Sequence, residues 1–404
     1  MALVALLSAR DGARDHADGD RSGSLIEFGG QPLVGYQARL AVAAGAERVL
    51  IHVDEVTPEL SRLVDQIGGP RAPEVALFQD MTILARSLAP EDRVLLIAEN
   101  IILPPDTLAS LLVAGPAAVL ALPAVPATSD LERIDGGAVW GGALCLPATR
   151  VLATIDMLGE WDLALTLLRR AVQDGIARVA LSPEMVMEGR LALVHDQESA
   201  DLALQALSDR SQADLSGRAS GLGSLLAPVS RAMVRELVRR QIDPSLPVAL
   251  SLLLASAGLA LGLSGWMISA LGVMLLALGT CDLARQAALV TLRVAGPPWR
   301  ERLVHGAGLA LLALSGLHLS GGQPLMLAGA GLPVFLIGVL ALADERAPPA
   351  GLWTRWARLT VPAATLIIFL GYLLGRPDGA FALLAALCAL IVTIRLFPGV
   401  QKVA

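Results

Sequence analysis

The sequence predicts two domains in series, an α/β domain over residues 1–208 and an all-helical membrane domain over residues 245–404. In the first, short runs typical of strands alternate with helical segments. In the second, six apolar stretches follow one another almost to the end of the chain. With 54% hydrophobic and 17% charged residues, the chain is too apolar for a wholly soluble protein of its length.

The α/β prediction rests on six short apolar runs and on four helical segments between them. Prolines open three of the helical segments, where a missing N–H costs nothing. The predicted strands are 3–7, 48–53, 75–78, 93–97, 117–121 and 138–145. The predicted helices are 32–44, 58–67, 105–112 and 161–174.

Two segments connect the domains. Residues 209–225 are rich in Ser, Gly and Asp, which predicts a linker. Residues 226–244 carry an amphipathic pattern in which Val229, Met233 and Leu237 share one face and arginines occupy the other. This pattern favours a helix lying in the membrane interface, with a soluble linker helix as the alternative.

The six predicted spans are 246–264, 266–281, 303–319, 324–343, 359–374 and 380–396. Arginines gather before the first span and in alternate loops after it, whereas the remaining loops carry only Arg376. This asymmetry predicts a multi-pass protein of a bacterial-type inner membrane with both termini in the cytoplasm. Membrane lipid is therefore an expected partner, and the Gly- and Ala-rich helix faces favour a homodimer.

A phosphate-binding loop is predicted after the first strand. The chain reads Ser8-Ala9-Arg10-Asp11-Gly12-Ala13-Arg14, and later Gly29-Gly30-Gln31-Pro32-Leu33. This pattern resembles the sugar-phosphate nucleotidyltransferases, although Arg10 replaces a glycine of the family and its loop lysine is absent. The resemblance implies a Rossmann-like, GT-A type α/β fold that binds a nucleotide. It implies Gly12, Arg14, Arg21 and Gly30 as nucleotide-binding residues, with Arg21 in place of the lysine.

The same resemblance implies a Mg²⁺ site. Glu99 follows the strand 93–97, where the family has a metal-binding aspartate. Asp135 and Asp162 are the alternatives for a second carboxylate. Phosphate transfer needs a cation to neutralise developing charge, so Mg²⁺ is the expected cofactor. The competing interpretation is a nucleotidyltransferase-like fold whose site has decayed.

The membrane half carries a second, degenerate motif that begins at Asp282. The order of the two halves resembles the bifunctional inositol-phosphate cytidylyltransferase/CDP-alcohol phosphatidyltransferase proteins, whose second half uses D-x-x-D-G-x-x-A-R and two further aspartates. This chain reads Asp282-Leu283-Ala284-Arg285, and from residue 246 onward its only other aspartates are Asp344 and Asp378. One carboxylate cannot assemble the family's metal site, which argues against the family reaction by the family mechanism.

Asp282 remains the candidate catalytic residue of this half, because an ionisable group at membrane depth indicates function. The alternative is a structural ion pair with Arg285, three residues further along the helix.

Three functions follow as hypotheses. The favoured one is an accessory or pseudoenzyme role in phospholipid or polyol-phosphate head-group synthesis, with CTP or a CDP-alcohol as the nucleotide partner. The alternative is an active nucleotidyltransferase, acting on an NTP and a sugar or polyol phosphate, anchored by a non-catalytic membrane domain. A transporter is third, since the spans lack a pair of broken helices. The net charge of −6 gives no reason to expect nucleic acid.

Overall fold

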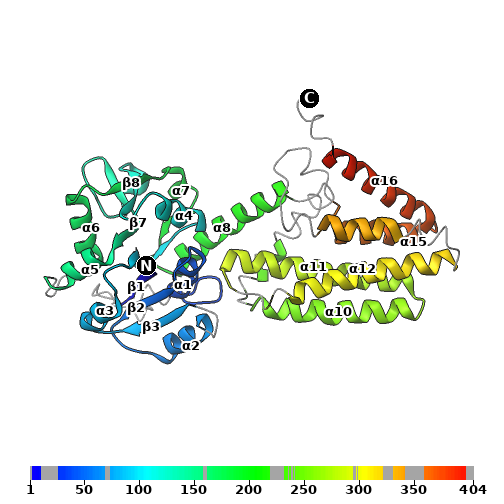
Figure 1. The fold of residues 1–404 in the computed structure, drawn as a ribbon, viewed down its shortest axis with the longest axis horizontal. Helices are drawn as coiled ribbons and strands as arrows, with labels where there is room; N and C mark the ends of the chain where they lie inside the picture. The colour runs from blue at the N-terminus through cyan, green and yellow to red at the C-terminus, as the bar shows by residue number, and fades with distance from the viewer. Residues whose placement is uncertain are drawn as a thin grey trace, which may run out of the picture. The chain divides into compact units, whose positions relative to one another are not determined.

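The computed structural model describes residues 2–10, 26–68, 73–157, 162–218, 232–234, 236–237, 240, 242–293, 297, 299–321, 331–341 and 359–396. The chain divides into two compact units, Met1–Ser208 and Asp209–Ala404 (Figure 1). The first unit is α/β and the second is helical, as the sequence predicts.

The first unit is built on a seven-stranded mixed sheet with the strand order β3-β2-β1-β4-β7-β6-β8. All of its strands are parallel except β7, which runs antiparallel to its neighbours β4 and β6. The strands are β1 (Leu3–Ala9), β2 (Arg48–Val53), β3 (Glu74–Phe78), β4 (Arg93–Ile97), β6 (Ala118–Pro123), β7 (Ala138–Pro147) and β8 (Ala177–Ala180). A separate antiparallel pair joins β5 (Ile101–Ile102) to β9 (Ala192–Leu193).

Helices connect these strands, and side-chain caps fix where several of them begin. Thr57 caps α2 and Asp80 caps α3, each by accepting a hydrogen bond from a backbone N–H of the first turn. The helices are α1 (Leu33–Ala43), α2 (Pro58–Ile67), α3 (Met81–Ser87), α4 (Pro105–Val113), α5 (Ala148–Ile155), α6 (Leu163–Gln173), α7 (Glu184–Met187) and α8 (Gln197–Arg218). A 3-10 turn, η2, covers Pro126–Thr128.

The predicted linker, residues 209–225, begins within a helix. α8 extends through the first ten of these residues to Arg218, and residues 219–225 lie outside the described residues. None of residues 209–218 forbids helical backbone angles.

The core of the first unit explains why its polar residues gather at one edge. The middle of β1 is buried on both faces, with Val4, Ala5, Leu6 and Leu7 each 3% exposed or less. A central parallel strand covered by helices on both faces has this continuous apolar pattern. Polar side chains of β1 therefore occur only at its carboxyl end, where Ser8 follows Leu7.

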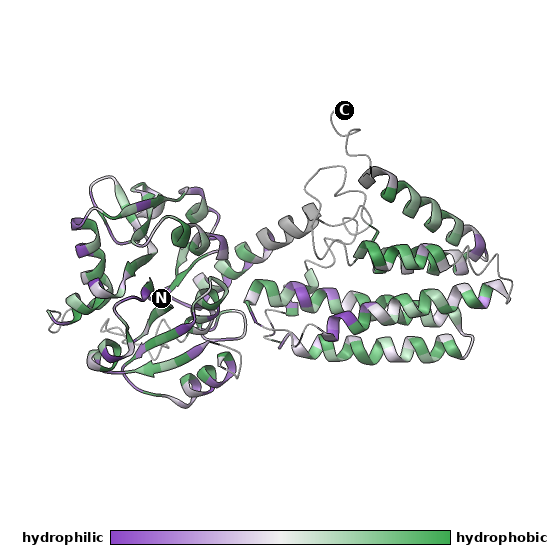
Figure 2. Ribbon diagram, in the orientation of Figure 1, coloured by the Kyte–Doolittle hydropathy of each residue, from purple (hydrophilic) through white to green (hydrophobic). Residues whose placement is uncertain are grey.

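The second unit consists of apolar helices around a shared core (Figure 2). Small residues allow close packing: a Cβ added at Gly258 would lie 3.2 Å from the carbonyl oxygen of Ala270, on the neighbouring helix. The labelled helices are α10 (Ser245–Leu263), α11 (Met267–Thr291), α12 (Trp299–Ser320), α15 (Val361–Leu373) and α16 (Pro377–Leu396).

Three helices among the described residues are long and apolar enough to cross a membrane, namely α10, α11 and α12. Shorter apolar helices cover Gly331–Ala341, Val361–Leu373 and Pro377–Thr393. The predicted span 266–281 forms the first part of α11, which continues to Thr291 with the polar side chains of Asp282 and Arg285 exposed on its surface. Much of the predicted interfacial helix, 226–244, lies outside the described residues.

Candidate functional site

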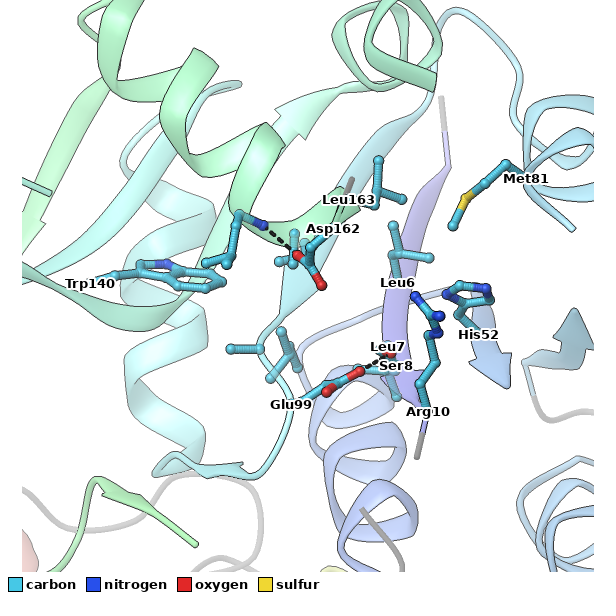
Figure 3. A pocket seen from close by; sticks show the side chains of 15 residues that line it. Leu6, Leu7, Ser8, Arg10, His52, Met81, Glu99, Trp140, Asp162 and Leu163 are labelled. Carbon is cyan, nitrogen blue, oxygen red and sulfur yellow. Dashed lines mark hydrogen bonds between the residues drawn. The ribbon is translucent and has the colours of Figure 1, made fainter. Parts of the chain in front are cut away.

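A cavity of about 210 Å³ opens at the carboxyl ends of β1, β2 and β4 (Figure 3). The beginnings of β7 and α6 complete it, because β7 runs antiparallel and so starts at this same edge. Its polar lining side chains are Ser8, Arg10, His52, Glu99, Trp140 and Asp162.

The position of the cavity follows from the strand order. From β1 the chain moves outward to β2 and β3, then returns to the other side of β1 to form β4. Connections that leave a sheet in opposite directions open a crevice at the carboxyl ends of the two central strands, and this is where open α/β sheets bind ligands. Ser8 and Glu99 follow those two strands, so the topology alone brings them together.

Glu99 is held in the cavity from two directions. The Ser8 hydroxyl donates a hydrogen bond to its carboxylate (Figure 3). Behind it, the buried Gln37 of α1 donates from Nε2 to the carbonyl oxygens of Ala98, at 2.9 Å, and Ile101, at 2.8 Å. Between them, Asn100 adopts a left-handed conformation with φ of 57°. The loop that carries Glu99 is therefore anchored to α1, one of the helices that pack against the sheet.

The pKa of the Glu99 carboxyl is raised by its surroundings. Burial raises the pKa of Glu99 above its usual value, and the nearby negative charge of Asp162 raises it further. The hydrogen bond from Ser8 and the charge of Arg10 oppose this rise. A carboxylate with a raised pKa beside a second carboxylate favours a bound cation, which would relieve the repulsion between them.

Asp162 contributes from the opposite wall. Its carboxylate caps α6, accepting a hydrogen bond from the backbone N–H of Leu165 at 2.8 Å (Figure 3). The same side chain lines the cavity. Asp162 therefore lies at the N-terminal end of a helix, which favours negative charge, and at the wall of the cavity.

Two basic groups stand on a third side. Arg10 forms an ion pair with Asp54, with Nε 2.8 Å from Oδ1. His52 stacks on Phe78 with ring centroids 5.0 Å apart. Burial lowers the pKa of His52, and the charge of Arg10 lowers it further. His52 is therefore neutral at pH 7, and Arg10 is the cation that faces the two carboxylates.

The donor set fits one hard divalent cation shared with a ligand. No group of three or more His, Cys, Asp or Glu side chains within the described ranges could hold a metal by itself. Mg²⁺ is commonly held by one or two carboxylates while phosphate oxygens and water complete its coordination. Glu99 and Asp162 suit that role.

The other predicted residues are placed elsewhere or lie outside the described ranges. Asp135, the alternative to Asp162, does not line the cavity: it accepts hydrogen bonds from the guanidinium of Arg178 at 2.6 Å and from the N–H of Gly137 at 2.8 Å. Gly30 has φ of 78° in a tight turn with Gly29 and is not among the lining residues. Gly12, Arg14 and Arg21 fall outside the described residues.

Sequence reasoning missed His52 and Trp140. His52 lies within a strand and Trp140 begins another, and neither belongs to a motif. Arg10 was noted only as a departure from a glycine. The signal that marks His52 is a polar residue next to the last position of an apolar strand, but strand order is needed to use it.

In the second unit, Asp282 lies on the surface of α11. Its expected ion pair with Arg285 does not form; Arg285 instead reaches α12, with Nη1 3.4 Å from Oε1 of Glu301. Asp282 has no ion-pair partner in the part of the chain that the structure describes.

No family model matches the chain, and no curated protein matches it. Among solved structures, the inositol-1-phosphate CTP transferase from T. maritima matches with 16% sequence identity and a TM-score of 0.34. The match covers 45% of this chain and 86% of that one. At this identity and TM-score, the likeness identifies neither fold nor function.

Proposed function

We propose that this chain is a membrane-anchored nucleotide-binding protein of the nucleotidyltransferase/CDP-alcohol phosphotransferase fusion type. It would serve head-group synthesis as an accessory protein rather than as a phosphotransferase. The observation that carries the proposal is the convergence of Glu99 and Asp162, with Arg10 beside them, on a cavity at the switch point of the sheet. Such a place and charge pattern suit the phosphates of a nucleotide and a divalent cation.

In this proposal Glu99 and Asp162 hold Mg²⁺, and Arg10 faces the phosphates. When bound, the ion neutralises negative charge on the phosphate chain. Gly12, Arg14, Arg21 and Gly30 remain the proposed nucleotide-binding residues, as the resemblance implies. The cavity of about 210 Å³ is smaller than the roughly 300–1,000 Å³ of typical small-molecule sites, so the lining residues form one part of the site.

The helical unit would anchor the protein as a six-span, inner-membrane domain with both termini in the cytoplasm. Three helices of spanning length and three shorter apolar helices support this count. The loss of the acidic motif after Asp282 supports a non-catalytic role. Reporter fusions at the C-terminus and after Arg376 test the topology: the first should report cytoplasm and the second the opposite side.

A second function is favoured by the same pair of carboxylates, since two acids facing one cleft are also what nucleotidyl transfer requires. In that reaction, a phosphate oxygen of a sugar or polyol phosphate attacks the α-phosphorus of CTP, and pyrophosphate leaves.

One experiment tests both functions. The full chain, purified in detergent, is titrated with CTP and Mg²⁺ by calorimetry, then incubated with a panel of sugar and polyol phosphates while pyrophosphate is measured. Binding without pyrophosphate release supports the accessory role, and release supports the enzyme. Absence of binding would refute both.

The matched variants are Glu99→Gln, Asp162→Asn and the control Asp135→Asn. Asparagine caps helices as well as aspartate does, so Asp162→Asn removes a charge while keeping α6 capped. Asp135 is an acid of the same unit that lies outside the cavity. The first two should weaken Mg²⁺-dependent binding at least tenfold, and the control should leave it unchanged.

A further inference from the structure

A second cavity lies wholly within the helical unit, at the polar ends of α10, α11 and α12, and has a volume of about 350 Å³. Its lining is apolar on one side, through residues such as Val248, Leu289 and Leu292. Among the described residues, its charged lining consists of three arginines, Arg285, Arg293 and Arg300, against one acid, Glu301. The cavity therefore combines a net positive end with an apolar wall.

Ion pairs orient two of these arginines, Arg285 and Arg293. Nη2 of Arg293 lies 2.6 Å from Oδ2 of Asp243, just before α10, and the Arg293 side chain is only 15% exposed. Nη1 of Arg285 lies 3.4 Å from Oε1 of Glu301 on α12. Arg300 lies over the ring of Trp299, with its guanidinium carbon 5.6 Å from the ring centroid. Arg293 is thus fixed within the wall, while Arg285 is 59% exposed and has a long, imperfect ion pair.

The charge pattern excludes one ligand class and favours another. Arg285 stands where the resemblance implies a metal-binding aspartate, and a cavity lined by three arginines repels divalent cations. Guanidinium groups instead present forked N–H donors that match the oxygens of a phosphate. The first turn of α12 borders the cavity through Arg300 and Glu301, so the positive end of that helix adds to the same field.

We propose that this cavity binds a phosphate group directly, without a metal, through Arg285 and Arg300, with Arg293 positioning the wall. The ligand class is a phosphate monoester, carried by a phosphatidic-acid head group or by a soluble phosphorylated metabolite. The apolar wall suits the glycerol and first methylenes of a lipid, and the volume also suits a small sugar phosphate. The inference depends on the membrane anchoring proposed above but not on nucleotide binding by the first unit.

The test uses the full chain in nanodiscs and two kinds of probe. Phosphatidylcholine nanodiscs doped with a fluorescent phosphatidic acid report the lipid arm. Inorganic phosphate and glycerol phosphate, added to phosphatidylcholine nanodiscs, report the soluble arm by calorimetry. Binding in either arm supports the proposal and identifies the source of the phosphate. Binding in neither arm overturns it.

Arg285→Gln and Arg300→Gln are the test variants, and Arg302→Gln is the control. Arg302 lies on the first turn of α12, close to Arg300, but does not line the cavity. Arg302→Gln therefore removes the same charge at a similar depth. Each test variant should weaken binding roughly tenfold or more, as expected for the loss of a hydrogen bond between charged groups. An equal loss in the control would overturn the proposal, because it would mean that general surface charge attracts the ligand.

Two measurements keep the result clear. Thermal unfolding of each variant shows whether the chain is intact. If a glutamine variant fails to fold, wild-type binding is measured against salt concentration: a site built on arginines weakens as salt screens it, whereas salt-independent binding overturns the proposal. CTP binding is measured in parallel, so that failure of the phosphate site and failure of the nucleotide site are distinguished.

Discussion

Gln37 and Ile101 are joined by a hydrogen bond of 2.8 Å between the side-chain amide of one and the backbone carbonyl of the other, across 64 residues of sequence. A second bond from the same nitrogen reaches Ala98 at 2.9 Å. Gln37 is 1% exposed, so neither carbonyl finds water easily. One buried amide thus sets the path of the loop that carries Glu99.

Gln37→Leu is expected to loosen that loop. A buried carbonyl without a donor costs about 1–3 kcal/mol, and this change leaves two of them unsatisfied. Hydrogen–deuterium exchange of the full chain should accelerate across residues 93–103, and Mg²⁺-dependent nucleotide affinity should fall. Gln66→Leu, at an exposed position of α2, is the control and should change neither. Unchanged exchange in Gln37→Leu would show that the loop is held by other contacts.

Glu99→Gln is expected to stabilise the chain at neutral pH. The folded-state pKa of Glu99 is raised by burial, so the folded chain holds this proton more tightly than the unfolded chain. The contribution of Glu99 to stability is therefore present below the unfolded pKa and is lost as pH rises through the folded one. A gain of 1 kcal/mol would raise Tm by roughly 2–4 °C in a domain of this size.

Scanning calorimetry against pH checks this expectation. The difference in Tm between Glu99→Gln and wild type should shrink towards zero below about pH 4, where the wild-type carboxyl is protonated. Glu132→Gln, at an exposed glutamate, should show no such pH-dependent gain. A Glu99→Gln variant less stable than wild type at neutral pH would contradict the burial argument.

Gly142→Ala is expected to disrupt the first unit. Gly142 has φ of 82°, and a Cβ there would lie 2.1 Å from Cδ1 of Ile101. Overpacking of this kind costs roughly 1–3 kcal/mol, and the left-handed conformation adds strain. Since the carbonyl of Gly142 also accepts from the N–H of Ala98, at 2.8 Å, the damage reaches the Glu99 loop.

The matched control is Gly136→Ala, where an added Cβ meets nothing within 4 Å. Chemical unfolding of both variants provides the comparison. Equal stability of the two would mean that Ile101 moves aside without cost.

Gly258→Val is expected to separate α10 from α11. The added side chain would meet the backbone of Ala270, which cannot move as a side-chain tip can. The variant should lose monodispersity in detergent and unfold at a lower temperature. Gly279→Val is the control, because the space around Gly279 is open. A monodisperse Gly258→Val protein would show that the two helices tolerate a wider spacing.

Local signals in the sequence predicted much of the first unit. The apolar runs 48–53 and 93–97 match β2 and β4, and Pro58 opens α2 as expected. The exposed edge strand β8 was missed, because four residues with little burial carry no alternating pattern. The apolar stretch 266–281 predicted most of α11 but not its end at Thr291, because the continuous apolar character stops at Cys281 while the helix continues.

The candidate site shows where sequence reasoning stops. Glu99 was predicted from the resemblance, which implies a metal-binding acid just after the strand 93–97. Nothing in the local sequence distinguishes Asp135 from Asp162. In the structure, Asp135 forms an ion pair with Arg178, whereas Asp162 caps α6 at the cavity. That choice depends on which strands lie side by side. His52 was missed for the same reason, since its relevance arises only when β2 lies next to β1.

β7, the antiparallel strand of the seven-stranded sheet, contributes to the cavity in a way that the parallel strands do not. A parallel strand places only its last residues at this edge, and the helix that follows it packs against the sheet. β7 delivers its first residues, including Trp140, and the segment before it is a surface connection of irregular structure. None of residues 124–137 lines the cavity itself, so insertions or deletions there would act on ligand preference through the position of Trp140, while the strand register, fixed by buried side chains, stays constant. Relatives of this protein would be expected to diverge first in that connection.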